Sequence, residues 1–294
     1  KSQLRWMIGK DFHVLKMQHA VSPKLRVPTH AYAFDGFSKA NHIKTNNFIS
    51  VGSLAAGGLS NSWGCGVARF GDRHLASFPC ATSDMDHSYA TVSRRMGISG
   101  SELPDDLSDY FGLDQWSSGE IELDAIHKSI YKSYLKRKSS TNAMGVRIGR
   151  ARVAVLSADK GERKSCNLSG NCLWGCSRQS LYSATADLAS LKYRAGFEYR
   201  SGLVVESLDE RPEGGWAIHC SSTSDTLMAD KVLLAAGTLA TTRLALNVIS
   251  YKGQRRLLSC PTAAFLAWKP SLLGQPIKSG FGLGQLSFSV DIDT

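Results

Sequence analysis

The segment at residues 230–248, DKVLLAAGTLATTRLALNV, constrains the fold most, because its pattern changes twice within a short stretch. The apolar run at 232–234 is too short for a helix and has the length of a strand buried on both faces. Three small residues follow, and then leucines recur at roughly helical spacing, with Thr238 available as the N-cap. A strand, a small-residue turn and a helix N-terminus in this order bring backbone N–H groups toward a phosphate or a flat cofactor. An ordinary strand-to-helix turn of an α/β domain has the same pattern, so this segment alone identifies no ligand.

The composition is that of a globular protein, with 43% hydrophobic and 20% charged residues among 294. This length permits one large domain or two interleaved domains. The chain has no run of about eighteen apolar residues, so we expect no membrane span. The first residues lack the apolar core of a signal peptide, and the chain begins at Lys1 rather than Met, which indicates a processed or partial sequence.

The cysteine content indicates the cellular compartment of the protein, and the charge distribution bears on whether it binds nucleic acid. Seven scattered cysteines argue against a disulfide framework and favour a reducing compartment, so we expect a cytoplasmic protein. The formal net charge of +10 is compatible with binding nucleic acid. However, eight acids lie in residues 101–124 and eleven basic residues in 128–164, and neither block is interleaved with aromatic residues. We therefore expect both blocks to be solvated faces of an insertion and expect no nucleic-acid partner.

Hydrophobic periodicity predicts further elements along the chain. We expect Ile126, Ile130 and Tyr134 to share one helical face, and Leu181, Ala184, Leu188, Leu191 and Ala195 to share another. The expected elements are a helix at 84–97 ended by Gly97, a helix at 125–138, a strand at 152–156, a helix at 180–195, a hairpin of 202–210 with 216–222, and a strand within 284–293.

Two loops have residue types that suggest chemistry. In AAGGLSNSWGCG, residues 55–66, Gly57 and Gly58 permit close approach of backbone, Ser60 and Asn61 offer hydrogen bonds, and Trp63 offers a flat ring. The alternative is a surface glycine loop that buries one tryptophan.

In CNLSGNCLWGCSRQS, residues 166–180, the spacing is close to a ferredoxin cluster motif, but Ser169 stands where a second cysteine would be. With only Cys166, Cys172 and Cys176 left, we expect no metal or cluster there; a metal-binding or electron-transfer protein built on these thiols is the alternative function.

Four segments together resemble the glucose–methanol–choline type of FAD-dependent oxidoreductases, particularly bacterial members distantly similar to cholesterol oxidase. Hydrolase and nucleotide-triphosphate signatures (GxSxG, HExxH, GxxxxGK[ST]) do not occur in the sequence. The similar segments appear in the family's order over most of residues 50–250 and are GGLSNSWG (57–64), DMDHSYATVSRRMGISG (84–100), CNLSGNCLWGCSRQSLYSA (166–184) and LLAAGTLATTRLAL (233–246).

The resemblance implies an α/β (α+β overall) fold, in which an FAD/NAD(P)-binding Rossmann-like domain is interleaved with a substrate-binding domain. It assigns 1–70 and 166–250 to the FAD domain, 71–165 to a helical, loop-rich substrate-side insertion, and 251–294 to the start of the substrate domain. It implies FAD as cofactor, a small-molecule alcohol as substrate and an electron acceptor. The FAD contacts that it implies come from Gly57, Gly58, Ser60, Asn61, Trp63, Gly64, Val205, Ala235, Ala236 and Gly237.

The resemblance also implies parts that the printed sequence lacks. The family opens with a βαβ unit that contains GxGxxG and an acidic residue for the ribose, and nothing before residue 46 fits it. The family's catalytic His, partnered by His or Asn, would follow Thr294. We therefore expect a piece of a longer flavoenzyme that binds FAD weakly or not at all alone, and we assign no catalytic residue.

Overall fold

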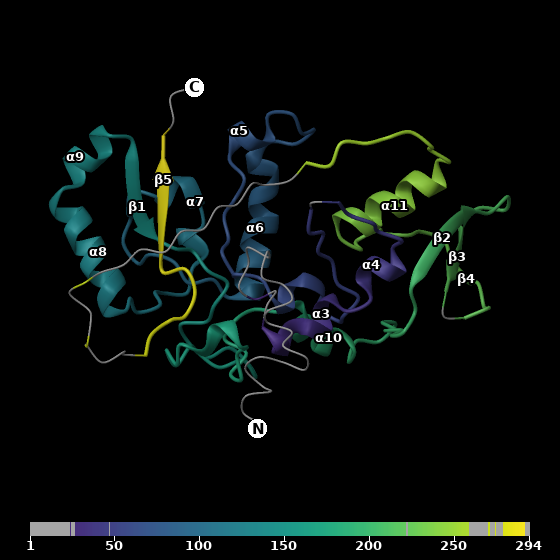
Figure 1. Ribbon diagram of the computed structural model, residues 1–294, viewed down its shortest axis with the longest axis horizontal. Helices are drawn as coiled ribbons and strands as arrows, with labels where there is room; N and C mark the ends of the chain where they lie inside the picture. Colours follow the sequence, from purple (N-terminus) through teal and green to yellow (C-terminus); the bar gives the residue numbers. More distant parts are fainter. Residues whose placement is uncertain are drawn as a thin grey trace. The chain divides into compact units, whose positions relative to one another are not determined.

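The computed structural model describes residues 24, 27–46, 48–221, 223–258, 270, 274 and 279–291 (Figure 1). The described residues form two compact units. The first takes its residues from Lys1–Ser62 and Ala184–Leu266, and the second from Trp63–Ser183 and Ala267–Thr294. The expected domain boundaries after residues 70 and 165 both lie within the second unit, and 21 of the 44 residues in 251–294 lie outside the described residues. Which unit binds cofactor and which binds substrate stays a prediction.

The first unit combines a small antiparallel sheet with short helices. Its sheet has the order β2–β3–β4, and α11 packs against β2 (Figure 1). The elements of this unit are the 3₁₀ helix η3 (Pro28–His30), α3 (Ala31–Phe34), α4 (Phe37–Ala40), the 3₁₀ helix η4 (Gly58–Asn61), α10 (Ala184–Leu191), β2 (Val205–Glu210), β3 (Trp216–Cys220), β4 (Leu227–Ala229) and α11 (Thr238–Val248).

The predicted hairpin is confirmed as β2 and β3, which pair antiparallel from Glu210 with Trp216 to Val205 with Cys220. Its turn needs glycine, since Gly214 and Gly215 both have positive φ angles of 94° and 81°. A Cβ at Gly215 would lie 2.8 Å from the Ala229 carbonyl oxygen at the end of β4. The glycines of the turn therefore determine how β2 and β3 pair and how closely the end of β4 approaches them.

The predicted strand at 232–234 is wrong. This run joins no sheet among the described residues, and Leu233 is 92% exposed. A strand buried on both faces needs a layer packed against each face, and the exposure of Leu233 shows that its side chain has no such layer; the described sheet of this unit pairs β2, β3 and β4 without it. Thr238 is the first residue of α11 and not its N-cap. Gly237 takes that position with φ 82° and ψ 162°, a conformation open essentially to glycine alone.

The predicted helix at 180–195 is confirmed only in part, as the shorter α10. The face expected for it is not buried: none of the α10 residues is fully buried, and Ala195 is exposed beyond its end. Small residues such as Ala186 and Ala189 give this helix little apolar surface to pack.

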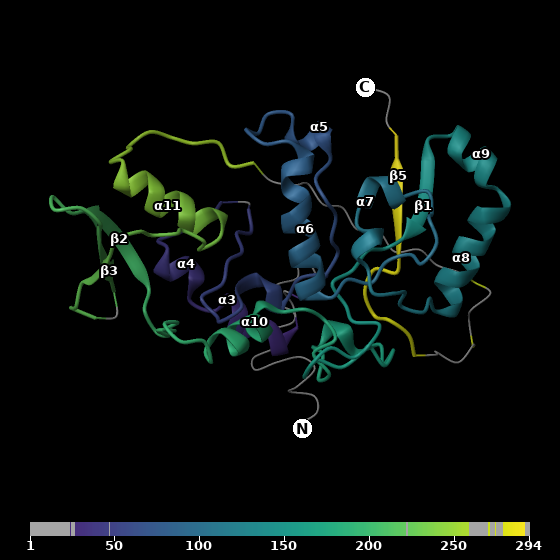
Figure 2. The same ribbon diagram turned by 180° about the vertical axis from the view of Figure 1, so that it is seen from behind.

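Among its described residues, the second unit combines helices with two paired strands. Its two strands, β1 and β5, pair antiparallel with Ile148 opposite Phe288, and α8 and α9 lie beside β1 (Figures 1 and 2). The elements are α5 (Asp72–Leu75), α6 (Thr82–Met96), α7 (Ser108–Phe111), the 3₁₀ helix η5 (Asp114–Trp116), α8 (Ala125–Lys136), α9 (Lys138–Ala143), β1 (Val146–Arg150), the 3₁₀ helix η6 (Asn171–Leu173) and β5 (Leu286–Val290).

Several local predictions hold in this unit. The segment expected to be helical and loop-rich, 71–165, forms mostly helices and loops but also contains strand β1. Helix α6 ends at Gly97, and β5 forms within 284–291, the described part of the expected tail strand. Helix α8 begins after Asp124, whose carboxylate accepts the N–H of His127. Of its expected apolar face only Tyr134 is buried, while Ile126 and Ile130 remain exposed.

The predicted strand at 152–156 is wrong, because the segment lies in the core but forms only isolated bridges. Val153 forms single bridges with Gly66 and with Ser99, and Val155 forms one with Leu181. Val153, Val155 and Leu156 are almost fully buried. Different loops pair with this segment one residue at a time, so no continuous ladder of strand hydrogen bonds forms. The apolar residues that suggested a strand are explained by burial in the core.

The two charged blocks are not simply solvated faces, which corrects that expectation. Arg152, from the basic block, is fully buried and makes ion pairs with Asp105 and Asp114 from the acidic block, at 2.9 and 2.6 Å. In this buried network, the charge of Arg152 is compensated by two carboxylates of the other block.

The described part of the chain is a mixed fold of helices and antiparallel strands. None of the helices in the described part of the chain combines the length and hydrophobicity needed to cross a bilayer.

Candidate functional site

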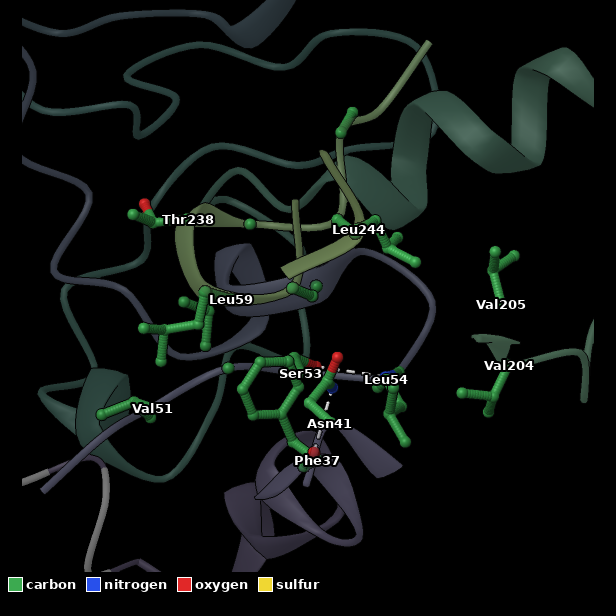
Figure 3. A pocket seen from close by; sticks show the side chains of 18 of the residues that line it. Phe37, Asn41, Val51, Ser53, Leu54, Leu59, Val204, Val205, Thr238 and Leu244 are labelled. Atoms are coloured by element: carbon green, nitrogen blue, oxygen red, sulfur yellow. Dashed lines mark hydrogen bonds between the residues drawn. The ribbon is translucent and has the colours of Figure 1, made fainter. Parts of the chain in front are cut away.

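The first unit contains a cavity of about 570 Å³, within the range of roughly 300–1,000 Å³ usual for ligand pockets (Figure 3). Segments distant in sequence build it: α4, the loop 51–59, the start of β2 and the turn into α11. In Figure 3, Phe37 and Asn41 lie across the cavity from Thr238 and Leu244, and Val204 and Val205 lie at its flank.

The α4 side of the cavity is held by close packing. Asn41 is 5% exposed, and its side-chain amide donates to the carbonyl of Phe37 at 3.0 Å. The loop passes directly over the Phe37 ring, because a Cβ at Gly52 would overlap the ring at 2.0 Å. No described residue donates a hydrogen bond to the side-chain oxygen of Asn41, so that oxygen is available to a ligand in the cavity.

The Gly/Ser loop brings Gly58 to the cavity. Gly57 and Gly58 have φ angles of 84° and 56°, and the turn that they make is held by side chains. Asn61 donates to the carbonyls of Ala56 and Gly58 at 2.8 and 3.0 Å, and the hydroxyl of Ser60 accepts the N–H of Ala184 at 2.9 Å. Gly57, Ser60 and Asn61 do not line the cavity; they fix the loop that presents Gly58.

The turn into α11 supplies the opposite wall through Ala235, Ala236 and Gly237. A Cβ added at Gly58 or at Gly237 would meet no atom within 4 Å, so the backbone at both glycines borders open space. The N–H of Ala236 is already bonded to the hydroxyl of Thr241 at 3.0 Å. The N-terminus of an eleven-residue helix therefore faces the cavity with its partial positive charge.

Arg243 connects α11 to the strand at the cavity flank. Its guanidinium donates to the carbonyls of Glu206 and Val205 at 3.0 and 3.2 Å. The carbonyl of Val205 is therefore engaged within the protein, and a ligand at Val205 would meet its side chain rather than that oxygen.

Trp63 and Gly64 belong to the second unit and are not among the cavity residues. The Trp63 indole donates to the carbonyl of Tyr182 at 2.8 Å and meets the Tyr182 ring edge-on, with centroids 6.3 Å apart. The two halves of the loop 55–66 thus differ. Its first half lines a cavity, and its second half packs a tryptophan against a core, as the alternative interpretation expected.

The structure thus brings Gly58, Val205, Ala235, Ala236 and Gly237 together out of the ten residues that the sequence pointed to. Sequence reasoning missed Phe37 and Asn41, because residues 1–45 have no clear period. The available signal was Gly36 before a short helix that ends at Asn41, since asparagine is common at the C-terminus of a helix.

The cavity is electrically neutral apart from the helix dipole. Its described lining residues include no ionisable side chain, and Asn41, Ser53 and Thr238 are its polar side chains. Such a lining can bind, orient and shield a ligand, but it offers no group for proton transfer near neutral pH.

The cysteine loop lies in the second unit. Among the described residues there is no group of three or more His, Cys, Asp or Glu side chains arranged to hold a metal ion.

In comparisons with known proteins, no protein-family model matches the chain and no curated protein is significantly similar to it.

Proposed function

We propose that the chain is the cofactor-binding part of an FAD-dependent oxidoreductase that oxidises the CH–OH group of an alcohol or sugar-like substrate and passes electrons to an acceptor. The observation that carries the proposal is the cavity itself. Three places where the family resemblance implies FAD contacts, namely Gly58, Val205 and the turn at 235–237, line a single cavity in one unit. The proposal includes a Rossmann-like organisation of the complete cofactor domain.

The lining suits the adenosine half of FAD. Apolar side chains such as Leu59, Val205 and Leu244 can flank a flat neutral ring, and the Asn41 oxygen can accept a hydrogen bond from an amino group. The α11 N-terminus suits a phosphate beside the ribose. When bound, FAD supplies hydride acceptance, and the residues of this chain supply binding and orientation.

The test is a binding titration of the purified chain with FAD, AMP and riboflavin. We expect FAD and AMP to bind weakly, with dissociation constants on the order of 0.1–1 mM, because one helix N-terminus and an apolar wall provide only about 4–5 kcal/mol. Riboflavin, which lacks the adenosine and phosphate, should not bind in that range. Calorimetry or ligand-observed NMR measures all three.

A matched pair of variants locates the site. Thr238→Glu puts a carboxylate at the first position of α11, where it favours the helix but repels a phosphate, so FAD and AMP should bind at least about tenfold more weakly. Thr242→Glu adds the same charge at an exposed position outside the cavity and should leave binding unchanged. Equal binding by both variants, or no binding of AMP in the millimolar range, would contradict the proposed function.

A further inference from the structure

Helices α8 and α9 place part of the basic block on the outside of the second unit. They contact β1 and lie on the side of this strand away from β5 (Figures 1 and 2). Residues 125–143, which include both helices, contain no aspartate or glutamate and five lysines and arginines, namely Lys128, Lys132, Lys136, Arg137 and Lys138. A surface with charge of one sign attracts partners of the opposite sign.

The lysines of α8 form a stripe on the solvent side of the helix. Lys128, Lys132 and Lys136 are four residues apart and therefore share one face. Tyr134, the buried residue of α8, is two positions from Lys132 and from Lys136, and a helix turns by about 100° per residue, so these lysines project nearly opposite to it. All three lysines are exposed, and of the three only Lys128 approaches a carboxylate among the described residues, that of Glu122 at 4.0 Å. The lysine stripe thus presents largely uncompensated positive charge.

Exposed aliphatic side chains flank the lysine stripe on both sides. Ile126 and Ile130, at 41% and 38% exposure, lie along one edge of it, and Leu135, at 51%, lies along the other. A helix whose lysine-rich face borders exposed aliphatic side chains is typical of one that lies in the interface of an anionic bilayer.

The aromatic rings of α8 argue against single-stranded nucleic acid as the partner. Tyr134 is buried, and Tyr131 stacks on it with ring centroids 6.3 Å apart and an interplanar angle of 21°. These rings pack on each other within the unit, whereas a single-strand binding surface offers aromatic rings on which the bases stack. A bilayer, which has both negative charge and an apolar boundary, therefore fits the helix better than a nucleic acid does.

We propose that the protein docks on the surface of a bilayer containing anionic phospholipids through the α8 face, which consists of Lys128, Lys132, Lys136, Ile126 and Ile130. The lysine ammonium groups lie at the level of the lipid phosphates, and the isoleucines enter the boundary between headgroups and acyl chains. This docking does not depend on the proposed FAD site, since the cavity lies in the first unit and α8 in the second.

The experiment is cosedimentation of the purified full chain with vesicles at about 0.1 M salt. Vesicles of phosphatidylcholine with about one third phosphatidylglycerol should bind the protein at least about tenfold more tightly than phosphatidylcholine alone, because each lysine near an anionic surface adds roughly fivefold. Glycerol phosphate in excess over lipid should not compete, since the attraction depends on many charges arranged on a surface. Equal binding to both kinds of vesicle, or competition by glycerol phosphate, would overturn the proposal.

Matched lysine variants separate the α8 face from the net charge of the protein. Lys132→Gln together with Lys136→Gln should weaken binding to the anionic vesicles at least about tenfold. The control is Lys231→Gln together with Lys252→Gln, which removes the same charge from exposed positions of the first unit and should change binding less than about twofold. Equal weakening by the two pairs would show that α8 is not the docking face.

Isoleucine variants test whether the partner is a bilayer or any polyanion. Ile126→Gln together with Ile130→Gln keeps every charge and the helix propensity, so binding to the anionic vesicles should weaken at least about fivefold while binding to a DNA oligonucleotide stays unchanged. Both positions are exposed, and urea unfolding checks that the variant keeps its stability. Unchanged vesicle binding by this variant, or tighter binding of the native protein to DNA than to the vesicles, would contradict the membrane assignment.

Discussion

Replacing Arg152 with methionine is expected to destabilise the second unit by about 3–5 kcal/mol. The guanidinium is fully buried, and it binds Asp114 through Nε and Nη2 at 2.7 and 2.6 Å and Asp105 through Nη1 at 2.9 Å. It also lies over the Phe111 ring, 5.0 Å from the centroid. The Asp105 side chain is only 3% exposed, so removing the cation leaves a carboxylate in the interior with no opposite charge.

Urea unfolding followed by tryptophan fluorescence measures the loss. The control is Arg147→Met, which removes an arginine whose ion pair to Asp291 is 3.4 Å long and whose side chain is 52% exposed. That exposed pair should be worth no more than about 1 kcal/mol. A similar small effect for both variants would show that the Arg152 network does not stabilise the fold.

The Arg152 variant should also change how stability depends on pH. Burial raises the pKa of Asp114, but hydrogen bonds and charge from Arg152 outweigh this, so in the native protein the pKa lies below its ordinary value of 3.8. The stabilisation is therefore present above about pH 4 and is lost as the pH falls through the folded-state pKa. Without the cation, burial, the largest effect on this carboxyl, outweighs the remaining hydrogen bond from Ser108 and raises the pKa, so the variant should lose stability as the pH rises. The difference between the two proteins should thus shrink on acidification from about pH 6 to about pH 3.

Substituting alanine for Gly97 is expected to cost about 2–4 kcal/mol, the second largest effect. Gly97 closes α6 with φ 74° and ψ 101°, and its N–H donates to the carbonyl of Ser93 at 2.9 Å. A Cβ at this position would lie 2.2 Å from Cδ2 of Leu156, which is 2% exposed. Backbone strain and overpacking of the core therefore act together, since a buried leucine has little room to move.

A matched glycine separates these two causes. Gly161 also has a positive φ of 55°, but a Cβ there would meet nothing within 4 Å. Gly161→Ala should therefore cost only the backbone term, about 1 kcal/mol. In a Leu156→Ala background, which removes the clashing methyl, Gly97→Ala should cost about as much as Gly161→Ala. Equal costs for the two glycines in the native background would disprove the packing argument.

Local patterns by themselves determined part of this protein. The β2–β3 hairpin, the end of α6 at Gly97 and the strand β5 were predictable, because each depends on turn residues or side-chain alternation within a few positions. Likewise, the small residues at 235–237 predicted a place where backbone could approach a ligand, and the structure places them at the cavity; a ligand there stays a prediction.

Only the tertiary structure decided which segments meet. Residues 232–234 and 153–156 have the same apolar character, yet neither run forms a strand: the first is left outside the sheet and the second is buried among loops. The basic block looked solvated, but Arg152 is buried because two aspartates from the acidic block reach it. Phe37 and Asn41 became cavity residues in the same way. Each of these outcomes, namely strand pairing, burial of a charge and closure of a cavity, depends on residues far away along the chain. The spacing of neighbouring residues does not show which distant residues these are.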